Sequence, residues 1–132
     1  MYEVSIRQEF SAAHNLREIG GKCESLHGHN FKVEVAVESA TLDDQGLVID
    51  FRLLKDSLAS VLNQLDHKFL NDDVEDFRDG GLNPSAENIA RWIYERLSEA
   101  LKTRLLPTGR DVSVSTVRVW ESESSSAAYV AD

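Results

Sequence analysis

The sequence predicts an α+β protein in which an antiparallel four-stranded sheet carries two helices on one face, in the order strand, strand, helix, helix, strand, strand. Segments that alternate between apolar and polar residues open and close the chain. Two segments with apolar residues at three- and four-residue steps lie between them. The 132 residues, 42% of them hydrophobic, suit a single domain over residues 1–132, since no repeat or linker marks a second one.

Two strands are predicted near the start of the chain. The first covers residues 2–10, where apolar side chains occupy even positions. The second covers residues 31–37, where apolar side chains occupy odd positions. The segment between them, residues 15–30, is too long for a tight hairpin, and a long loop in a small domain is often functional.

Two amphipathic helices are predicted next. A turn at residues 43–46 and a short apolar run lead into the first, over residues 52–65. The second begins at a helix-start signal in residues 83–85 and continues to Pro107. The segment between the helices, residues 66–82, is polar and acidic, so we expect an exposed connection.

The end of the chain returns to strand patterns. Residues 112–120 are rich in β-branched side chains, but their apolar positions change from even to odd along the segment. This change indicates either a bulge or a strand that is buried on both faces. Residues 127–131 are predicted to add a short fourth strand.

Charge and composition exclude several classes of protein. Lys and Arg number 14 against 23 Asp and Glu, and the formal charge of −9 disfavours nucleic acids and anionic membranes as partners. No apolar run approaches the roughly 18 residues that a membrane span needs. The charged N-terminal residues do not resemble a secretory signal, and the single cysteine, Cys23, suits a reducing compartment. We therefore expect a cytoplasmic protein.

Three of the four histidines are predicted to meet at one end of the sheet. His27 and His29 share a face at the start of the second strand, because alternate residues of a strand point the same way. If the first two strands pair antiparallel, His14, just past the first strand, lies close to both. Three histidines with a free fourth position are typical of catalytic zinc, so zinc is the expected metal. The alternative interpretation of the His27–His29 pair is ordinary surface polarity.

Cys23 lies four residues before His27 in the same loop, and three interpretations are open for it. Zinc and imidazoles nearby favour the thiolate, which acts as a base or a nucleophile. Alternatively, Cys23 is a fourth ligand that closes a structural zinc site, or a small buried apolar side chain. The spacing does not distinguish these three interpretations.

Four acidic residues are further candidates. Asp66 beside His67 is a carboxylate–imidazole pair suited to proton transfer, although sequence neighbours rarely hydrogen-bond well and a solvated helix end is the alternative. Glu121 has the parity of the apolar residues that end its strand, so it either faces inward, where it accepts two N–H donors, or turns to solvent. Glu87 and Asp50 are interpreted as residues that favour helix starts.

Several separated motifs, taken together, resemble the 6-pyruvoyltetrahydropterin synthase family. They are Phe10-Ser-Ala-Ala-His14, Cys23-Glu-Ser-Leu-His27-Gly-His29-Asn30, Val48-Ile-Asp-Phe51, Leu65-Asp-His67 through Leu70-Asn-Asp72, Asn83-Pro-Ser-Ala-Glu87 and Val119-Trp-Glu121. The resemblance extends from residue 4 to about residue 130. The spacing of Cys23 and His27 is most similar to the bacterial branch, the 6-carboxytetrahydropterin synthases of queuosine biosynthesis.

The resemblance implies the tunnelling fold, assembled into a homohexamer of two stacked trimers with active sites between chains. In such an assembly, Asp66 and His67 serve the thiol of a neighbouring chain. The resemblance also implies zinc ligation by His14, His27 and His29, proton transfer by Cys23, Asp66 and His67, anchoring of the pterin by Glu121, and a place near the substrate side chain for Glu87. The implied reaction converts 7,8-dihydroneopterin triphosphate and water into 6-carboxy-5,6,7,8-tetrahydropterin, acetaldehyde and triphosphate.

Three further functions remain open for the same motifs. A sister enzyme releases only triphosphate and gives 6-pyruvoyltetrahydropterin. Relatives with a glutamate in the cysteine loop form a 6-hydroxymethylpterin for folate, and Glu24 keeps that reaction open. A non-enzymatic alternative is a zinc-stabilised pterin-binding module in which Cys23 is the fourth ligand. Because the net charge is negative, local cations must bind a triphosphate, and Lys22, Arg17 and Lys68 are the candidates.

Overall fold

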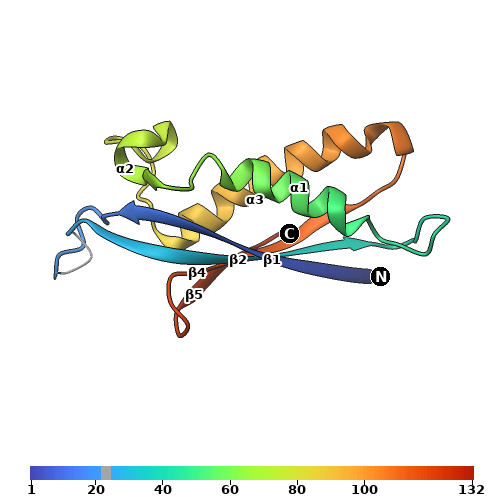
Figure 1. Cartoon of the computed structure of the whole chain (residues 1–132), viewed down its shortest axis with the longest axis horizontal. Helices are drawn as coiled ribbons and strands as arrows, with labels where there is room; N and C mark the ends of the chain where they lie inside the picture. Colours follow the sequence, from blue (N-terminus) through green and yellow to red (C-terminus); the bar gives the residue numbers. More distant parts are fainter. Residues whose placement is uncertain (22–24) are drawn as a thin grey trace.

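The structure, a computed structural model, describes residues 1–21 and 25–132. Its strands are β1 (Tyr2–His14), β2 (His27–Ser39), β3 (Lys68–Phe69), β4 (Ser113–Trp120) and β5 (Ser126–Val130). They form one sheet in the order β3-β1-β2-β4-β5, and the long helices α1 (Phe51–Leu62) and α3 (Ala86–Leu105) cover one of its faces (Figure 1). The predicted α+β class and the order of the main elements are confirmed, with one strand more than expected.

Strands β1 and β2 form the longest pairing of the sheet. They pair antiparallel along their whole lengths, from Tyr2 opposite Ser39 to His14 opposite His27. Both strands are longer than the sequence pattern predicts, because their ends near the histidines contain Ala and Gly, which extend the backbone ladder without an apolar alternation. His14 is therefore the last residue of β1 rather than a residue beyond it.

Of the two interpretations of the slipped apolar pattern, the structure has the bulge. The register between β2 and β4 shifts between Ala36 and Val37, which makes Ser115 the extra residue of β4. This extra residue allows Val114 and Val117 both to be buried. The short last strand, β5, pairs antiparallel with β4 as predicted.

Both long helices begin with a capping side chain. The Asp50 carboxylate accepts a hydrogen bond from the backbone N–H of Arg52 at 2.8 Å, and the Ser85 hydroxyl accepts one from the N–H of Asn88 at 3.2 Å. The range of α3 agrees with the prediction, whereas α1 ends earlier than expected, in a turn. No helix in the described part of the chain is long and apolar enough to cross a membrane.

The connection between α1 and α3 is more ordered than the exposed loop predicted for residues 66–82. After β3 it forms α2 (Leu70–Asp73) and the short 3-10 helix η2 (Glu75–Phe77). Within residues 66–82 the buried apolar side chains are Leu70, Val74 and Phe77. These few apolar residues stand among many acids, which hides their pattern in the sequence. Because β3 runs parallel to β1, the expectation of a wholly antiparallel sheet is wrong for this strand.

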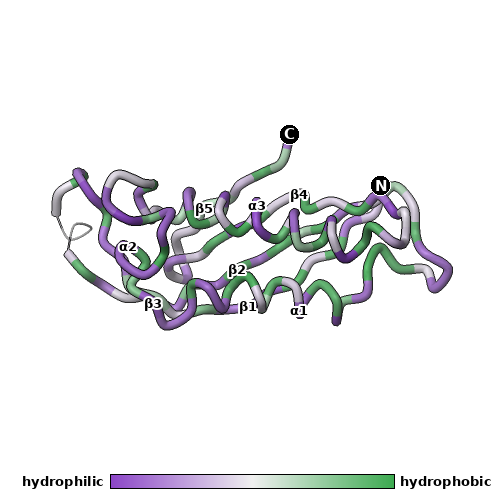
Figure 2. Tube along the Cα trace, turned by 90° about the horizontal axis from the view of Figure 1, so that it is seen from above, coloured by the Kyte–Doolittle hydropathy of each residue, from purple (hydrophilic) through white to green (hydrophobic). Residues whose placement is uncertain are grey.

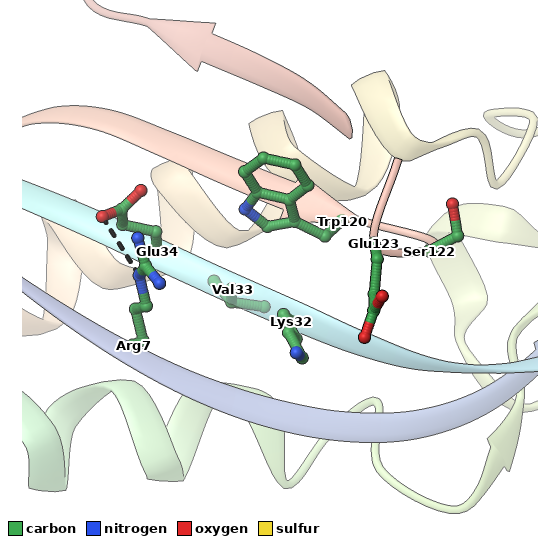
Figure 3. A pocket seen from close by; sticks show the side chains of 7 residues that line it. All are labelled: Arg7, Lys32, Val33, Glu34, Trp120, Ser122 and Glu123. Atoms are coloured by element: carbon green, nitrogen blue, oxygen red, sulfur yellow. Dashed lines mark hydrogen bonds and ion pairs between the residues drawn. The ribbon is translucent and has the colours of Figure 1, made fainter. Parts of the chain in front are cut away.

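The two faces of the sheet differ in polarity, and apolar and polar residues alternate along its strands (Figure 2). The face under the helices forms the core, in which Phe31 and Val33 have no exposed surface. The opposite face is polar. It carries a hollow lined by Arg7, Lys32, Val33, Glu34, Trp120, Ser122 and Glu123, where Arg7 and Glu34 form an ion pair at 3.3 Å (Figure 3).

Candidate metal centre and active site

Three histidines meet at one end of the sheet, as the sequence predicts. The register of β1 and β2 places His14 directly opposite His27, and His29 lies two residues along the same face. One ligand atom from each ring lies within 4.8 Å of the others, and the ring centroids of His14 and His27 are 4.6 Å apart. Three imidazoles at this separation can bind one metal ion.

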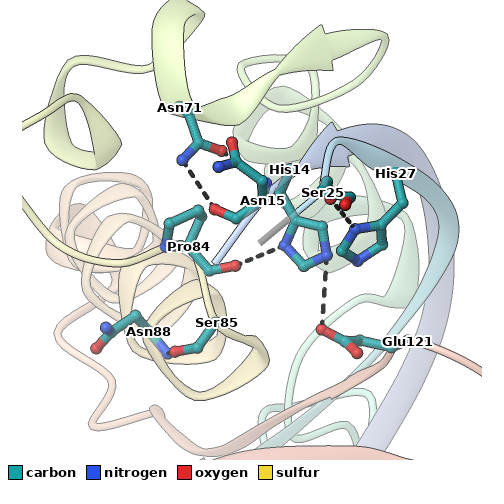
Figure 4. Close-up of polar contacts among 9 residues, drawn as sticks. All are labelled: His14, Asn15, Ser25, His27, Asn71, Pro84, Ser85, Asn88 and Glu121. Atoms are coloured by element: carbon teal, nitrogen blue, oxygen red, sulfur yellow. Dashed lines mark hydrogen bonds and ion pairs between the residues drawn. The ribbon is translucent and has the colours of Figure 1, made fainter. Parts of the chain in front are cut away.

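Backbone carbonyls fix the orientation of two of these rings (Figure 4). The Nδ1 atom of His14 lies 2.7 Å from the carbonyl oxygen of Pro84, and Nδ1 of His27 lies 2.7 Å from that of Ser25. A carbonyl oxygen only accepts, so Nδ1 must carry the proton in each bond and Nε2 of the neutral ring is left bare. This is the tautomer that presents Nε2 to a metal.

Among the residues that the structure describes, two ring nitrogens of the cluster are buried and have no hydrogen-bond partner. They are Nε2 of His14 and Nε2 of His29. Buried polar atoms are nearly always satisfied in folded proteins, and an ion binding site is one of the explanations for an orphaned one. The unpaired atoms and their mutual distance therefore fit a metal ion with the three histidines as ligands.

The surroundings of His14 keep its imidazole neutral. Burial is the main reason that the pKa of His14 lies below its ordinary value of 6.5, and the nearby His27 and His29 act in the same direction. The carbonyl of Pro84 and the carboxylate of Glu121 act in the opposite direction but do not outweigh burial. A neutral ring is the form that binds a metal, so the site favours ligation over protonation.

Glu121 faces the histidine cluster rather than solvent. Its carboxylate lies 3.8 Å from Nε2 of His14, and its side chain is 29% exposed. The residue directly follows β4, where its N–H donates to the carbonyl of Ser125 at 3.1 Å in the turn before β5. Of the two orientations that the sequence allows, the structure has the inward one.

Asp66 and His67 form a contact in spite of being sequence neighbours. Oδ2 of Asp66 lies 3.0 Å from Nδ1 of His67, whose backbone has a positive φ of 59°. Such a left-handed residue is uncommon outside glycine and turns the chain sharply, which brings the two side chains to the same side. The imidazole of His67 is 82% exposed, and it shares with His29 the lining of one open hollow.

Asp66 is also bound to strand β1. Its Oδ1 accepts a hydrogen bond from the backbone N–H of Ser11 at 2.9 Å, while the N–H of His67 donates to the carbonyl of Ser11. The bond from Ser11 is the main reason that the pKa of Asp66 lies below its ordinary value, and the contact with His67 adds to the effect. The pair is therefore held to the edge of β1 near the histidines.

The other candidate residues have different positions. Cys23 and Glu24 lie outside the described residues, as does Lys22. Glu87 is exposed in the first turn of α3, which agrees with its interpretation as a helix-start residue. The guanidinium of Arg17 donates to two backbone carbonyls, at 2.9 and 2.6 Å, so this side chain is engaged in holding the fold.

Sequence reasoning missed the groups that support the histidines from outside the metal site. The carbonyls of Pro84 and Ser25 orient two rings, and the ring of Phe31 packs against His14 and His29 with centroid distances of 5.4 Å to each. A backbone carbonyl has no signature in a sequence. The position of Phe31 did have a sequence signature, since it lies on the same face of β2 as His27 and His29.

The site as a whole combines a neutral imidazole cluster with a carboxylate beside it. Three ring nitrogens leave one coordination position free on a tetrahedral metal ion, and Glu121 lies next to the three rings. Such an arrangement suits a ligand that offers oxygen atoms to the metal and N–H donors to the carboxylate.

Comparisons with known proteins confirm the resemblance seen in the sequence motifs. The profile of the family described as 6-pyruvoyl tetrahydropterin synthase matches residues 3–132. A 6-carboxy-5,6,7,8-tetrahydropterin synthase of Synechocystis sp. is 43% identical over 96 residues, covering 69% of this chain and 70% of that protein. A dihydroneopterin monophosphate aldolase of Pyrococcus furiosus is 36% identical over 118 residues, covering 89% and 88%. The structure of Caenorhabditis elegans 6-pyruvoyl tetrahydropterin synthase matches with a TM-score of 0.80 and 27% identity, covering 100% and 98%.

The lowered pKa of Asp66 predicts a pH-dependent contribution to stability. A carboxyl whose pKa is lower in the folded chain stabilises the fold above its unfolded value, and this contribution is lost as the pH falls through the folded value. We therefore expect Asp66→Asn to unfold more easily than the unmodified protein at neutral pH, with a difference that shrinks as the pH falls below the ordinary carboxyl pKa of 3.8. Urea unfolding of both proteins across this range measures it. A difference that stays constant with pH would contradict the assignment.

Proposed function

Because the chain belongs to the 6-pyruvoyl tetrahydropterin synthase family, we propose that it is a zinc-dependent 6-carboxy-5,6,7,8-tetrahydropterin synthase, a lyase of queuosine biosynthesis in the cytoplasm. Its substrates are 7,8-dihydroneopterin triphosphate and water, and its products are 6-carboxytetrahydropterin, acetaldehyde and triphosphate. The observation that carries the proposal is the cluster of three imidazoles with Glu121 beside it. Relatives that bear this name at 31–43% identity support it.

In this proposal His14, His27 and His29 hold the zinc ion through their Nε2 atoms. The bound ion supplies Lewis acidity, which makes the hydroxyl groups and the adjacent C–H bond of the substrate side chain more acidic. The ligands themselves are neutral imidazoles, and carbonyl acceptors on Nδ1 fix the orientation of two of them. The expected metal is thus supported by the donor set and its burial.

The remaining residues position the substrate and move its protons. Glu121 accepts two N–H donors from the 2-amino-pyrimidinone edge of the pterin, which fixes the substrate side chain next to the histidines. Cys23 transfers protons between the side chain and the ring, and His67, oriented by Asp66, exchanges a proton with the same region. Glu87 is proposed near the substrate side chain from its place in the family motif.

We also propose a homohexamer, built as two stacked trimers with active sites between chains. Two features support this assembly. The outer edge of β1 carries β3 only at Ala12 and Ala13, and β5 stands at the other edge of the sheet, so both edges offer backbone groups to a second copy. His67 is largely exposed at the β1 edge, where a neighbouring chain can approach it.

A second candidate function is aldol cleavage of a dihydroneopterin phosphate. The Pyrococcus furiosus relative is named for this reaction and matches a larger share of this chain than the Synechocystis synthase does. Formation of a 6-pyruvoyl or a 6-hydroxymethyl product, and pterin binding without turnover, are also compatible with the site. All of these functions use the same fold, so the product decides between them.

The product assay tests the proposed reaction. We expect zinc-loaded protein incubated with 7,8-dihydroneopterin triphosphate to give 6-carboxytetrahydropterin with an equal amount of acetaldehyde, measured by mass spectrometry and an aldehyde assay. A pyruvoyl or hydroxymethyl product, or conversion only of the monophosphate, would replace the proposed activity by a sister activity. The absence of any product would favour the binding module.

The role of Cys23 leads to a separate expectation. If the thiol transfers protons and is not a metal ligand, Cys23→Ala abolishes turnover but keeps one zinc per chain. Zinc content by atomic emission and turnover of the same preparations measure the two properties. His27→Ala is the matched control, since it should lose both. Loss of zinc in Cys23→Ala would show that the thiol closes the metal site.

A further inference from the structure

The backbone of residues 15–17, just beyond the pairing of β1 with β2, is still held by hydrogen bonds. In a strand, the N–H and C=O of one residue point to the same side, and those of alternate residues share that side. From Ser11 onward, the odd-numbered residues of β1 point these groups away from β2, toward the segment that follows α1. Asp66 and His67 bind the backbone of Ser11, and Phe69 of β3 pairs with Ala13.

Side-chain amides continue this pattern of backbone hydrogen bonds at Asn15 and Arg17, which follow β1. Oδ1 of Asn71 accepts from the N–H of Asn15 at 3.0 Å, and its Nδ2 donates to the carbonyl of the same residue at 2.9 Å. Asn83 repeats the arrangement two residues later: its Oδ1 accepts from the N–H of Arg17 at 2.9 Å, and its Nδ2 donates to the carbonyl of Arg17 at 3.2 Å. Each amide thus satisfies both backbone groups of one residue.

Both amides bind the chain just after His14, the candidate metal ligand at the end of β1. His14 directly precedes Asn15, and its ring is bound by the carbonyl of Pro84, which directly follows Asn83. Asn71 is only 8% exposed, and Asn83 is itself held by Nδ2 of Asn88, which donates to its carbonyl at 2.9 Å. The backbone and the ring of His14 are therefore located by the same two short segments.

We propose that Asn71 and Asn83 are positioning residues of the metal centre, whose amides replace a partner strand and fix the chain after His14 so that its Nε2 stays directed at His27 and His29. Only an amide fits this task, because each position needs one acceptor and one donor on the same planar group. An aspartate keeps the acceptor but puts a second oxygen against a carbonyl. The proposal rests on the metal site of the proposed function.

The test compares zinc affinity in Asn71→Asp and Asn83→Asp, by competition with a chromophoric chelator. We expect zinc to bind about 10- to 100-fold more weakly in both variants, as when the supports of metal ligands are removed in other proteins. In the metal-free variants, backbone hydrogen exchange measured by NMR should accelerate around residues 15–17. A charge at the buried Asn71 also disturbs folding, so a second variant is needed. Asn83 is less buried and tests the same role.

Two controls separate positioning from charge and from general loss of stability. Asn63→Asp adds the same charge at the exposed C-cap of α1, and Leu97→Ala removes a fully buried side chain from α3. Both should bind zinc as the unmodified protein does. Unchanged zinc affinity in folded Asn71→Asp and Asn83→Asp would overturn this proposal while the metal site stands. No zinc binding by the unmodified protein would overturn the metal site, and the proposal with it.

Discussion

The antiparallel pairing of β1 with β2 is the constraint on which the candidate site depends. It holds His14 opposite His27 and puts His29 on the same face, so three candidate ligands from two strands meet without a dedicated loop. A slip of one residue would send the ligands of one strand to the other face. The stacked rings of Phe10 and Phe31, with centroids 4.9 Å apart in the core, oppose such a slip because it would expose an aromatic ring.

Elements far along the chain supply the other groups around the histidine cluster. The segment just before α3 supplies the carbonyl of Pro84 to His14, and the turn directly after β4 supplies Glu121. The segment after α1 binds the outer edge of β1 through Asp66, so one carboxylate contacts both the strand of His14 and the imidazole of His67. The proposed chemistry is therefore coupled to the fold, since the residues that would move protons also hold the sheet edge that carries a ligand.

The sequence predicted those features whose physical cause lies in local patterns. Alternation located the strands, apolar steps and caps located both long helices, and the histidine spacing located the cluster. The segment after α1 was misjudged because its order comes from a few buried side chains and from contacts with β1, such as the pairing of Ala13 with Phe69. The inward orientation of the Glu121 side chain also could not be predicted from the sequence, because a residue at the end of a strand can face the core or solvent.

The central claim is that the sheet end binds zinc through three histidines and keeps a coordination position free. X-ray absorption at the zinc edge of the loaded protein tests it most directly. The account predicts three nitrogen ligands at about 2.0–2.1 Å with an additional light-atom neighbour and no sulfur. A sulfur neighbour at about 2.3 Å would instead mean that Cys23 closes the tetrahedron and that the centre is structural.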